Sequence, residues 1–290
     1  MKQEKVLTTN DIVFKKVFTS PQNGHILIGF INDILELEVT EVDVGNTYNF
    51  KTICEENKNP EVRYTEVDVL ARLQDGSQII IEMQVCKRRW FRERAMFYMT
   101  ERYSNNYGNQ DLEIPFEEYS GTGKKYSSLR PTYGIFIMLD NEFKEDDIPI
   151  HRFRVKDIEN DLTYKNSQGQ ELFTMIFLEL RKSSTSMRKE IRQWFDYFLK
   201  GKVKNDAPKY LQDACKEANY HNLEEEERDM ISARERAIQD AGAARAYAWF
   251  EGKAEGKAEL FRDMITKGKT IREIAEFMEI SEDEVKLIVE

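Results

Sequence analysis

The chain has 290 residues, 40 % hydrophobic and 33 % charged, a composition typical of a folded globular protein rather than a disordered one. It has no run of about 18 apolar residues, and its first residues, MKQEKVLTTN, lack an apolar segment, so we expect a cytoplasmic protein without a membrane partner. The net charge of −10 is unevenly distributed: residues 221–290 hold 11 Lys/Arg against 18 Asp/Glu, whereas residues 84–102 hold six basic and two acidic residues, so one basic surface is expected.

The first half of the chain predicts an α/β core. Asn10 or Asp11 can cap the first helix, and SPQNG separates this helix from a second one. Short β-rich runs then predict three strands, followed by helical spacing and by the continuously apolar GIFIML of a central strand. The expected order is helix, helix, three strands, helix and strand, at residues 12–18, 25–37, 39–50, 61–73, 78–86, 87–107 and 134–139.

The second half of the chain is expected to be mainly helical. HRFRVKDIEN, from residue 151, fits an edge strand, whereas ELFTMIFLELRKS (171–183) and MRKEIRQWFDYFLKG (187–201) predict amphipathic helices. Ser281 and Glu284 predict a capping box between two short terminal helices. We therefore expect a core at residues 1–165, a helical continuation at 166–223 and an all-helical extension for interaction or oligomerisation at 224–290.

Two acids interrupt the apolar runs of DVLARLQDGSQIIIEMQ, residues 68–84. Successive side chains of a strand point to opposite faces, so the loop between the two runs decides where the acids lie. A two-residue loop would set Asp68 opposite Met83 and separate the carboxylates. A three-residue loop with Gly76 in the left-handed region sets Asp68 opposite Glu82, with about 5 Å between their Cβ atoms. We expect the second arrangement.

Two facing carboxylates repel each other unless a cation lies between them. Mg²⁺ suits such a pair, because it binds one or two carboxylates, keeps several waters and completes its shell with phosphate. Gln84 shares the face of Glu82 and can orient an attacking water. The chemistry predicted is phosphodiester hydrolysis, with phosphate contacts from the basic segment that follows, namely Lys87, Arg88, Arg89, Arg92 and Arg94.

Further segments occur in order along the chain: NDIVFKKVF, EVDVLAR, IIIEMQ, FRERAMFYMTERY and GKKYSSLRPTYGIFIM. With an acid on one strand and E-x-Q on the next, this series resembles the PD-(D/E)XK nuclease superfamily. More narrowly, it resembles the recombination-promoting nucleases of bacteria, which are transposase-like proteins. The likeness is strong over residues 8–140 and looser in FRVKDI, FLELRK and EGKAEGKAE. It implies a metal-dependent DNA endonuclease with an αβββαβ core, linked to recombination, mobile elements or phage defence.

By position, the resemblance assigns the metal to Asp68, Glu82 and the carbonyl of Met83, with Asp11 as a further acid of the site. The metal it implies is Mg²⁺, with Mn²⁺ or Ca²⁺ as alternatives. Gln84 stands where the superfamily usually has lysine, so positive charge beside the attacked phosphate has to come from elsewhere. The residues expected to contact DNA are Lys15, Lys16, Arg88, Arg89, Arg94 and Tyr98.

Other interpretations stay open. Because Gln84 replaces lysine, the chain also fits a nuclease fold that lacks activity and serves in protein interaction. The terminal helices allow a helix-turn-helix interpretation, in which the chain is a DNA-binding regulator, although EDEVKLIVE is acidic and unsuited to the major groove. Asp11 is as well placed to cap a helix as to bind metal, and residues 109–123 fit a loop or lid.

Overall fold

The computed structural model describes residues 8–47, 67–85, 89–113, 122–183 and 187–289. The chain divides into two compact units, Met1–Glu227 and Arg228–Glu290. The first unit is built on a six-stranded sheet, and the second consists of helices. Within the described ranges, no helix combines the length and the apolar character needed to cross a membrane.

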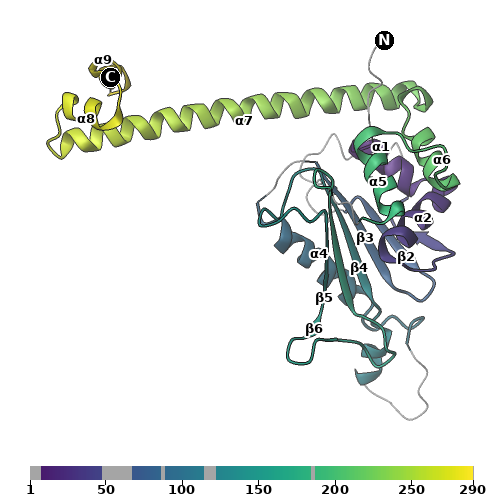
Figure 1. Ribbon diagram of the computed structural model, residues 1–290. Coiled ribbons are helices and arrows are strands. Elements are labelled where there is room, and N and C mark those ends of the chain that lie inside the picture. Colours follow the sequence, from purple (N-terminus) through teal and green to yellow (C-terminus); the bar gives the residue numbers. More distant parts are fainter. Residues whose placement is uncertain (1–7, 48–66, 86–88, 114–121, 184–186, 290) are drawn as a thin grey trace. The chain divides into compact units, whose positions relative to one another are not determined.

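A mixed sheet with strand order β1-β2-β3-β4-β8-β5 forms the centre of the first unit (Figure 1). β3, β4 and β8 run parallel to one another, whereas β1, β2 and β5 pair antiparallel to their neighbours. Parallel central strands are buried on both faces, which accounts for their unbroken apolar runs. The strands are β1 Val42–Val44, β2 Val69–Leu73, β3 Gln78–Gln84, β4 Thr132–Met138, β8 Phe173–Glu179 and β5 Ile150–Arg154.

One face of the sheet is covered by helices from both ends of this unit (Figure 1). α1 contacts β2 and α2 contacts β1, while α5 and α6 pack on these two helices. Their shared core is aromatic: the rings of Phe30 and Trp194 meet edge to face at 4.8 Å, and Phe18 lies 5.2 Å from Phe30. The elements are α1 Asp11–Thr19, the 3-10 turn η1 Pro21–Asn23, α2 Gly24–Leu35, α5 Lys189–Lys200, α6 Lys209–Glu217 and η4 Tyr220–Asn222.

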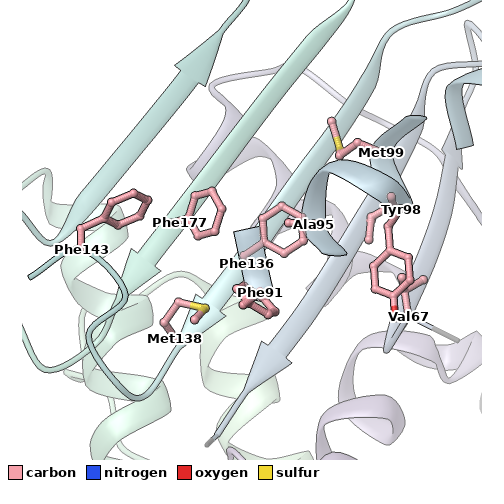
Figure 2. Packing of buried hydrophobic residues seen from close by; sticks show 10 residues of the cluster. Val67, Phe91, Ala95, Tyr98, Met99, Phe136, Met138, Phe143 and Phe177 are labelled. Atoms are coloured by element: carbon pink, nitrogen blue, oxygen red, sulfur yellow. The ribbon is translucent and has the colours of Figure 1, made fainter. Parts of the chain in front are cut away.

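The opposite face is covered by α4, Phe91–Asn105, which lies across β3 and β4. Phe91 of this helix meets the rings of Phe136 and Phe177 edge to face, at 5.8 and 6.3 Å (Figure 2). Ala95, Tyr98 and Met99 are buried in the same cluster (Figure 2). The 3-10 helix η3, Thr122–Ser128, lies between α4 and β4 in the chain. The expected order of helix, strands, helix and strand is confirmed.

The expectation of a helix at residues 171–183 is wrong, because this segment contributes β8 to the sheet. Its run FTMIFLE is apolar without interruption, and such a run suits a strand buried on both faces as well as a buried helix. HRFRVKDIEN supplies the edge strand β5 as expected and leads into a small ribbon of β6, Lys156–Asp157, and β7, Leu162–Thr163. The domain boundaries given above remain predictions.

The second unit contains most of α7, Glu225–Thr266, with α8, Ile271–Met278, and α9, Glu282–Val289. Phe261, Ile274 and Val285 are buried in its core. The capping box at Ser281 is confirmed, because Glu284 N–H donates to Ser281 Oγ at 3.1 Å and Ser281 N–H donates to Glu284 Oε2 at 3.1 Å.

The β2–β3 hairpin has the three-residue loop that the sequence predicts. Val69 pairs with Ile81, and Leu73 N–H donates to the carbonyl of Ser77 at 2.9 Å. Gly76 has φ +83°, in the left-handed region that a residue without Cβ adopts at no cost. This register extends to Asp68 opposite Glu82.

We expect Gly76→Ala to lower the free energy of unfolding by about 1–3 kcal/mol, because the left-handed backbone strains any residue with a Cβ. The added Cβ would also lie 2.6 Å from Leu112 Cδ2. Urea denaturation followed by circular dichroism measures the loss. Gly24→Ala is the control, since Gly24 has a helical φ of −52° and open space around it, and equal losses in both variants would contradict the prediction.

Candidate functional site

Asp68 and Glu82 lie opposite each other where β2 begins and β3 ends. Met83 N–H donates to Asp68 Oδ2 at 2.7 Å, and Asp68 N–H donates to Glu82 Oε2 at 3.4 Å. Each carboxylate thus reaches the backbone of the opposite strand, and both side chains are partly buried. Two negative groups held this close and partly shielded from water favour a cation beside them. Met83 contributes its N–H here, and the role of its carbonyl stays a prediction.

Asn46, which the sequence did not single out, fixes the backbone around Asp68. Its Nδ2 donates to the carbonyls of Val67 and Asp68, both at 3.1 Å, and its Oδ1 accepts from Leu70 N–H at 2.8 Å. These bonds fix the backbone on both sides of Asp68, just before and within β2. The pair Gly45-Asn46 after a strand indicates a turn, and nothing in the sequence alone connects it to Asp68.

Arg94 brings a positive charge to this corner from α4. Its Nη2 lies 2.7 Å from Gln84 Oε1 and 3.4 Å from Glu82 Oε1. Its guanidinium carbon lies 5.0 Å from the centre of the Phe91 ring, a cation–π contact that adds to its fixation. Gln84 is buried, so its amide needs such a partner. Arg94 therefore supplies a cation beside Gln84 and Glu82.

The donor atoms at this corner fit a hard divalent cation. Asp68 and Glu82 offer carboxylate oxygens, Gln84 offers an amide oxygen on the same face as Glu82, and oxygen ligands are those that Mg²⁺, Mn²⁺ and Ca²⁺ prefer. The choice of metal ligands among these oxygens stays a prediction.

The structure places the expected residues of the first helix as follows. Asn10 is the cap of α1, accepting from Ile12 N–H, while the carboxylate of Asp11 accepts from the same N–H at 3.1 Å. Lys16 forms an ion pair with the buried Glu227 at 2.6 Å. Lys15 is partly buried on the same helix. Their parts in metal or DNA binding stay predictions, and for Lys16 DNA would have to compete with a buried carboxylate.

The expected DNA contacts near α4 differ in their surroundings. Arg88 lies outside the described residues, and Arg89 is exposed just before the helix. Tyr98 is buried, and its ring centre lies 5.9 Å from the guanidinium carbon of Arg94. Arg92 pairs instead with Glu142, with 3.1 Å between Nε and Oε1.

The family model described as PD-(D/E)XK nuclease family transposase matches residues 8–248, most of the chain. The chain belongs to this family. The match includes α1, the hairpin with Asp68 and Glu82, and α4, and it ends within α7. No curated protein and no solved structure gives a significant match. The resemblance and the fold class inferred from the sequence are confirmed, and nucleases of this family use divalent metals.

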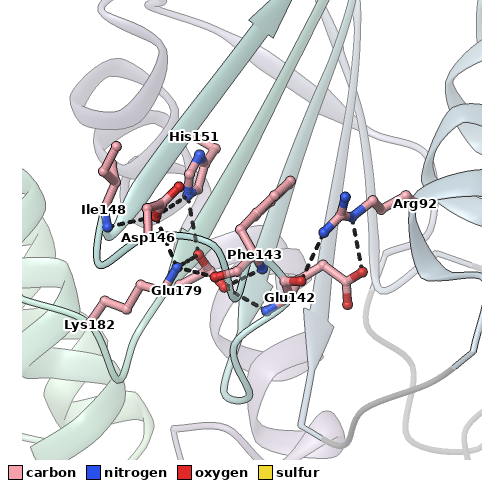
Figure 3. A network of polar contacts seen from close by, with 8 residues as sticks. All are labelled: Arg92, Glu142, Phe143, Asp146, Ile148, His151, Glu179 and Lys182. Carbon is pink, nitrogen blue, oxygen red and sulfur yellow. Dashed lines mark hydrogen bonds and ion pairs between the residues drawn. The ribbon is translucent and has the colours of Figure 1, made fainter.

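The first unit also contains three side chains of types that can bind a metal ion, namely Asp146, His151 and Glu179 (Figure 3). His151 Nε2 lies 3.3 Å from Glu179 Oε2 and 3.4 Å from Asp146 Oδ1. Glu179 also accepts from the backbone N–H groups of Glu142 and Phe143, which anchors the loop after β4 (Figure 3).

Lys182 already provides a cation at this group of side chains. Its ammonium lies 2.6 Å from Glu179 Oε2 and 3.2 Å from Asp146 Oδ1, and it also donates to the carbonyl of Phe143. Burial lowers the pKa of Lys182, but the hydrogen bonds with Glu179 and Asp146 raise it further, so the pKa lies above its usual value and the side chain stays charged. The charge of Glu179 is thus compensated within the chain, and the group serves to tie the β4 loop to β8.

We expect Lys182→Met to lower the free energy of unfolding by about 3 kcal/mol at pH 8, because it leaves the fully buried Glu179 without this cation. Thermal and urea unfolding measure the change. Lys189→Met is the matched control and should have little effect, since Lys189 pairs with Asp206 on the surface. A Lys182 variant as stable as the control would show that Glu179 does not depend on this pair.

Proposed function

We propose that the protein is a Mg²⁺-dependent DNA endonuclease that hydrolyses phosphodiester bonds at the corner formed by Asp68, Glu82 and Gln84. The observation that carries this proposal is that Asp68 and Glu82 lie opposite each other in the β2–β3 hairpin, with each carboxylate bonded to the backbone of the other strand. Both residues lie within residues 8–248, which match the PD-(D/E)XK nuclease family. Mn²⁺ or Ca²⁺ are alternative ions.

Asp68 and Glu82 would hold the metal, with the carbonyl of Met83 as a further ligand and Asp11 completing the site. When bound, the metal lowers the pKa of a water and stabilises negative charge on the phosphate. The rigid placement of both acids, through Asn46 and Met83 N–H, suits them to hold a cation without reorganising.

Gln84 and Arg94 would share the role that lysine has elsewhere in the superfamily. The amide oxygen of Gln84 can accept a hydrogen bond from the attacking water, and the guanidinium of Arg94 can donate to a phosphate oxygen. In support, the two side chains are bonded at 2.7 Å next to Glu82, so both lie within reach of one phosphate. Lys15, Lys16, Arg88, Arg89 and Tyr98 are the further DNA contacts proposed, and a role in recombination, mobile elements or phage defence follows the resemblance.

We expect the full-length protein to nick or linearise supercoiled plasmid in Mg²⁺ and not in EDTA. Asp68→Asn and Glu82→Gln should each lower the rate at least about a hundredfold, because a neutral amide binds Mg²⁺ poorly. Arg94→Ala should lower the rate while leaving metal binding intact. Gel electrophoresis measures the products, and Asp206→Asn, which alters a surface ion pair, is the control and should cleave normally.

Intact plasmid at all protein and metal concentrations, with a folded protein, would favour the inactive interaction protein instead. Loss of DNA binding on deletion of residues 265–290 would favour a regulator acting through its terminal helices.

The C-terminal unit is proposed to join copies of the chain. α7 exposes the rings of Tyr247, Trp249 and Phe250, and large exposed apolar patches mark interaction surfaces. Gly252 and Gly256 follow on the same helix, and a Cβ added at either would meet nothing within 4 Å, so another helix can approach closely there. Residues 249–290 lie beyond the family match.

We expect Trp249→Ala combined with Phe250→Ala to shift the full-length protein towards monomer, because the change removes apolar area that an oligomer would bury. Size-exclusion chromatography with light scattering measures the mass. Phe277→Ala, which removes an exposed phenylalanine of α8, is the control. A wild-type protein that is already monomeric at high concentration would overturn the proposal.

A further inference from the structure

Two large aromatic side chains, one just before α4 and one within it, are exposed to solvent. The same helix carries Arg94 to the corner formed by Asp68, Glu82 and Gln84, here called the acid corner. Trp90, the residue before the helix, is 74 % exposed, and Phe97 is 63 % exposed. Phe91 and Tyr98 of this helix, by contrast, are turned inwards and buried in the core. The exposed pair is therefore not part of the packing that attaches α4 to the sheet.

The backbone at Trp90 is strained in a way that its packing does not explain. Its φ is 62°, in the left-handed region, whereas residues at helix N-caps ordinarily have extended backbone. A bulky residue in this region costs of order 1–3 kcal/mol, and such strain is concentrated at functional sites. The other described non-glycine residues with positive φ are Glu36, Asp161 and Glu279, none of them aromatic.

Arg94 connects this aromatic pair to the acid corner. It lies four residues after Trp90 and three before Phe97, so all three side chains occupy neighbouring parts of the helix surface. Its Nη2 is bonded to Gln84 at 2.7 Å. Trp90 and Phe97 are separated by about 10 Å along the helix. A phosphate held at Gln84 and Arg94 would thus carry its nucleoside past these rings.

The charges near Phe97 favour a base over a phosphate. Arg89 precedes Trp90 and Arg94 lies one turn after it, whereas Glu93 and Glu101 lie one turn to either side of Phe97. Carboxylates repel a phosphate backbone, but an uncharged base can stack on a ring between them. In a duplex the bases are stacked on one another and are not available to such rings, whereas in unpaired strands they are.

We propose that Trp90 and Phe97 form a stacking surface for unpaired nucleobases next to the cleavage site, so that the preferred substrate is single-stranded or locally unpaired DNA. This inference rests on the nuclease function proposed above and names its substrate class. Arg94 holds the phosphate, and the two rings receive the bases that adjoin it.

The test compares the binding of three labelled DNAs to the full-length protein in EDTA, where no cleavage is expected, by fluorescence anisotropy. The DNAs are a short oligothymidine, a strand of equal length made of abasic nucleotides, and a duplex. We expect Trp90→Ala and Phe97→Ala each to weaken oligothymidine binding roughly tenfold, as the loss of one stacked base does. Binding of the abasic strand, which has the phosphates but no bases, should not change.

Two controls keep the result specific to stacking. Trp90→Phe keeps a ring and should retain most of the affinity, while Phe277→Ala removes an exposed ring elsewhere and should have no effect. Ala keeps the same backbone strain at Trp90, and circular dichroism checks that each variant is folded. Equal binding of oligothymidine by the wild type and both alanine variants would overturn the inference, as would equal wild-type affinity for the abasic strand.

The experiments distinguish a failure of the stacking proposal from a failure of the nuclease proposal. Metal-dependent plasmid cleavage with unchanged oligothymidine binding in the alanine variants would remove the stacking surface and leave the nuclease. No cleavage of any DNA by the folded protein would remove the nuclease function itself.

Discussion

The structure depends on the register of the β2–β3 hairpin. Side chains of a strand alternate between faces, so a shift of one residue would move Asp68 away from Glu82. The left-handed Gly76 closes a three-residue loop and sets the register, while Asn46 fixes the backbone where β2 begins. The acids are therefore positioned by backbone geometry remote from them, and the local apolar residues Ile79 and Ile81 keep the strand in place because they are fully buried on the other face.

α4 links this corner to the rest of the sheet. Its buried side places Phe91 on Phe136 and Phe177, and this packing directs Arg94 towards Gln84 and Arg92 towards the loop after β4. Gln84, Met138 and Glu179 are level with one another across β3, β4 and β8. In this row of the three parallel strands, Gln84 lies beside the acid pair, and Glu179 forms an ion pair with Lys182.

The sequence predicted what depends on local pattern: the hairpin loop, the shared face of its acids, the helices on either side and the capping box at Ser281. It failed at β8, because a short apolar run does not distinguish a strand from a helix when both faces are buried. It also did not find Asn46 or the ion pair of Lys16 with Glu227, since partners separated by 22 and 211 residues leave no periodic signal. Arg94 was expected to contact DNA, but its bond to Gln84 depends on the packing of α4, which the sequence does not show.

The aromatic core behind the acid corner joins segments made at very different times. Phe18 and Phe30 lie near the start of the chain, and the tryptophan and phenylalanine that complete their cluster, Trp194 and Phe198, follow more than 160 residues later. β3 likewise needs β4 and β8 beside it. During synthesis, the face that supports Asp68 and Glu82 stays incomplete until about two thirds of the chain has emerged, and folding of this kind, dominated by distant contacts, is slow. A chain that ends before Trp194 therefore lacks part of the core that supports the two acids, even when the hairpin that carries them is complete.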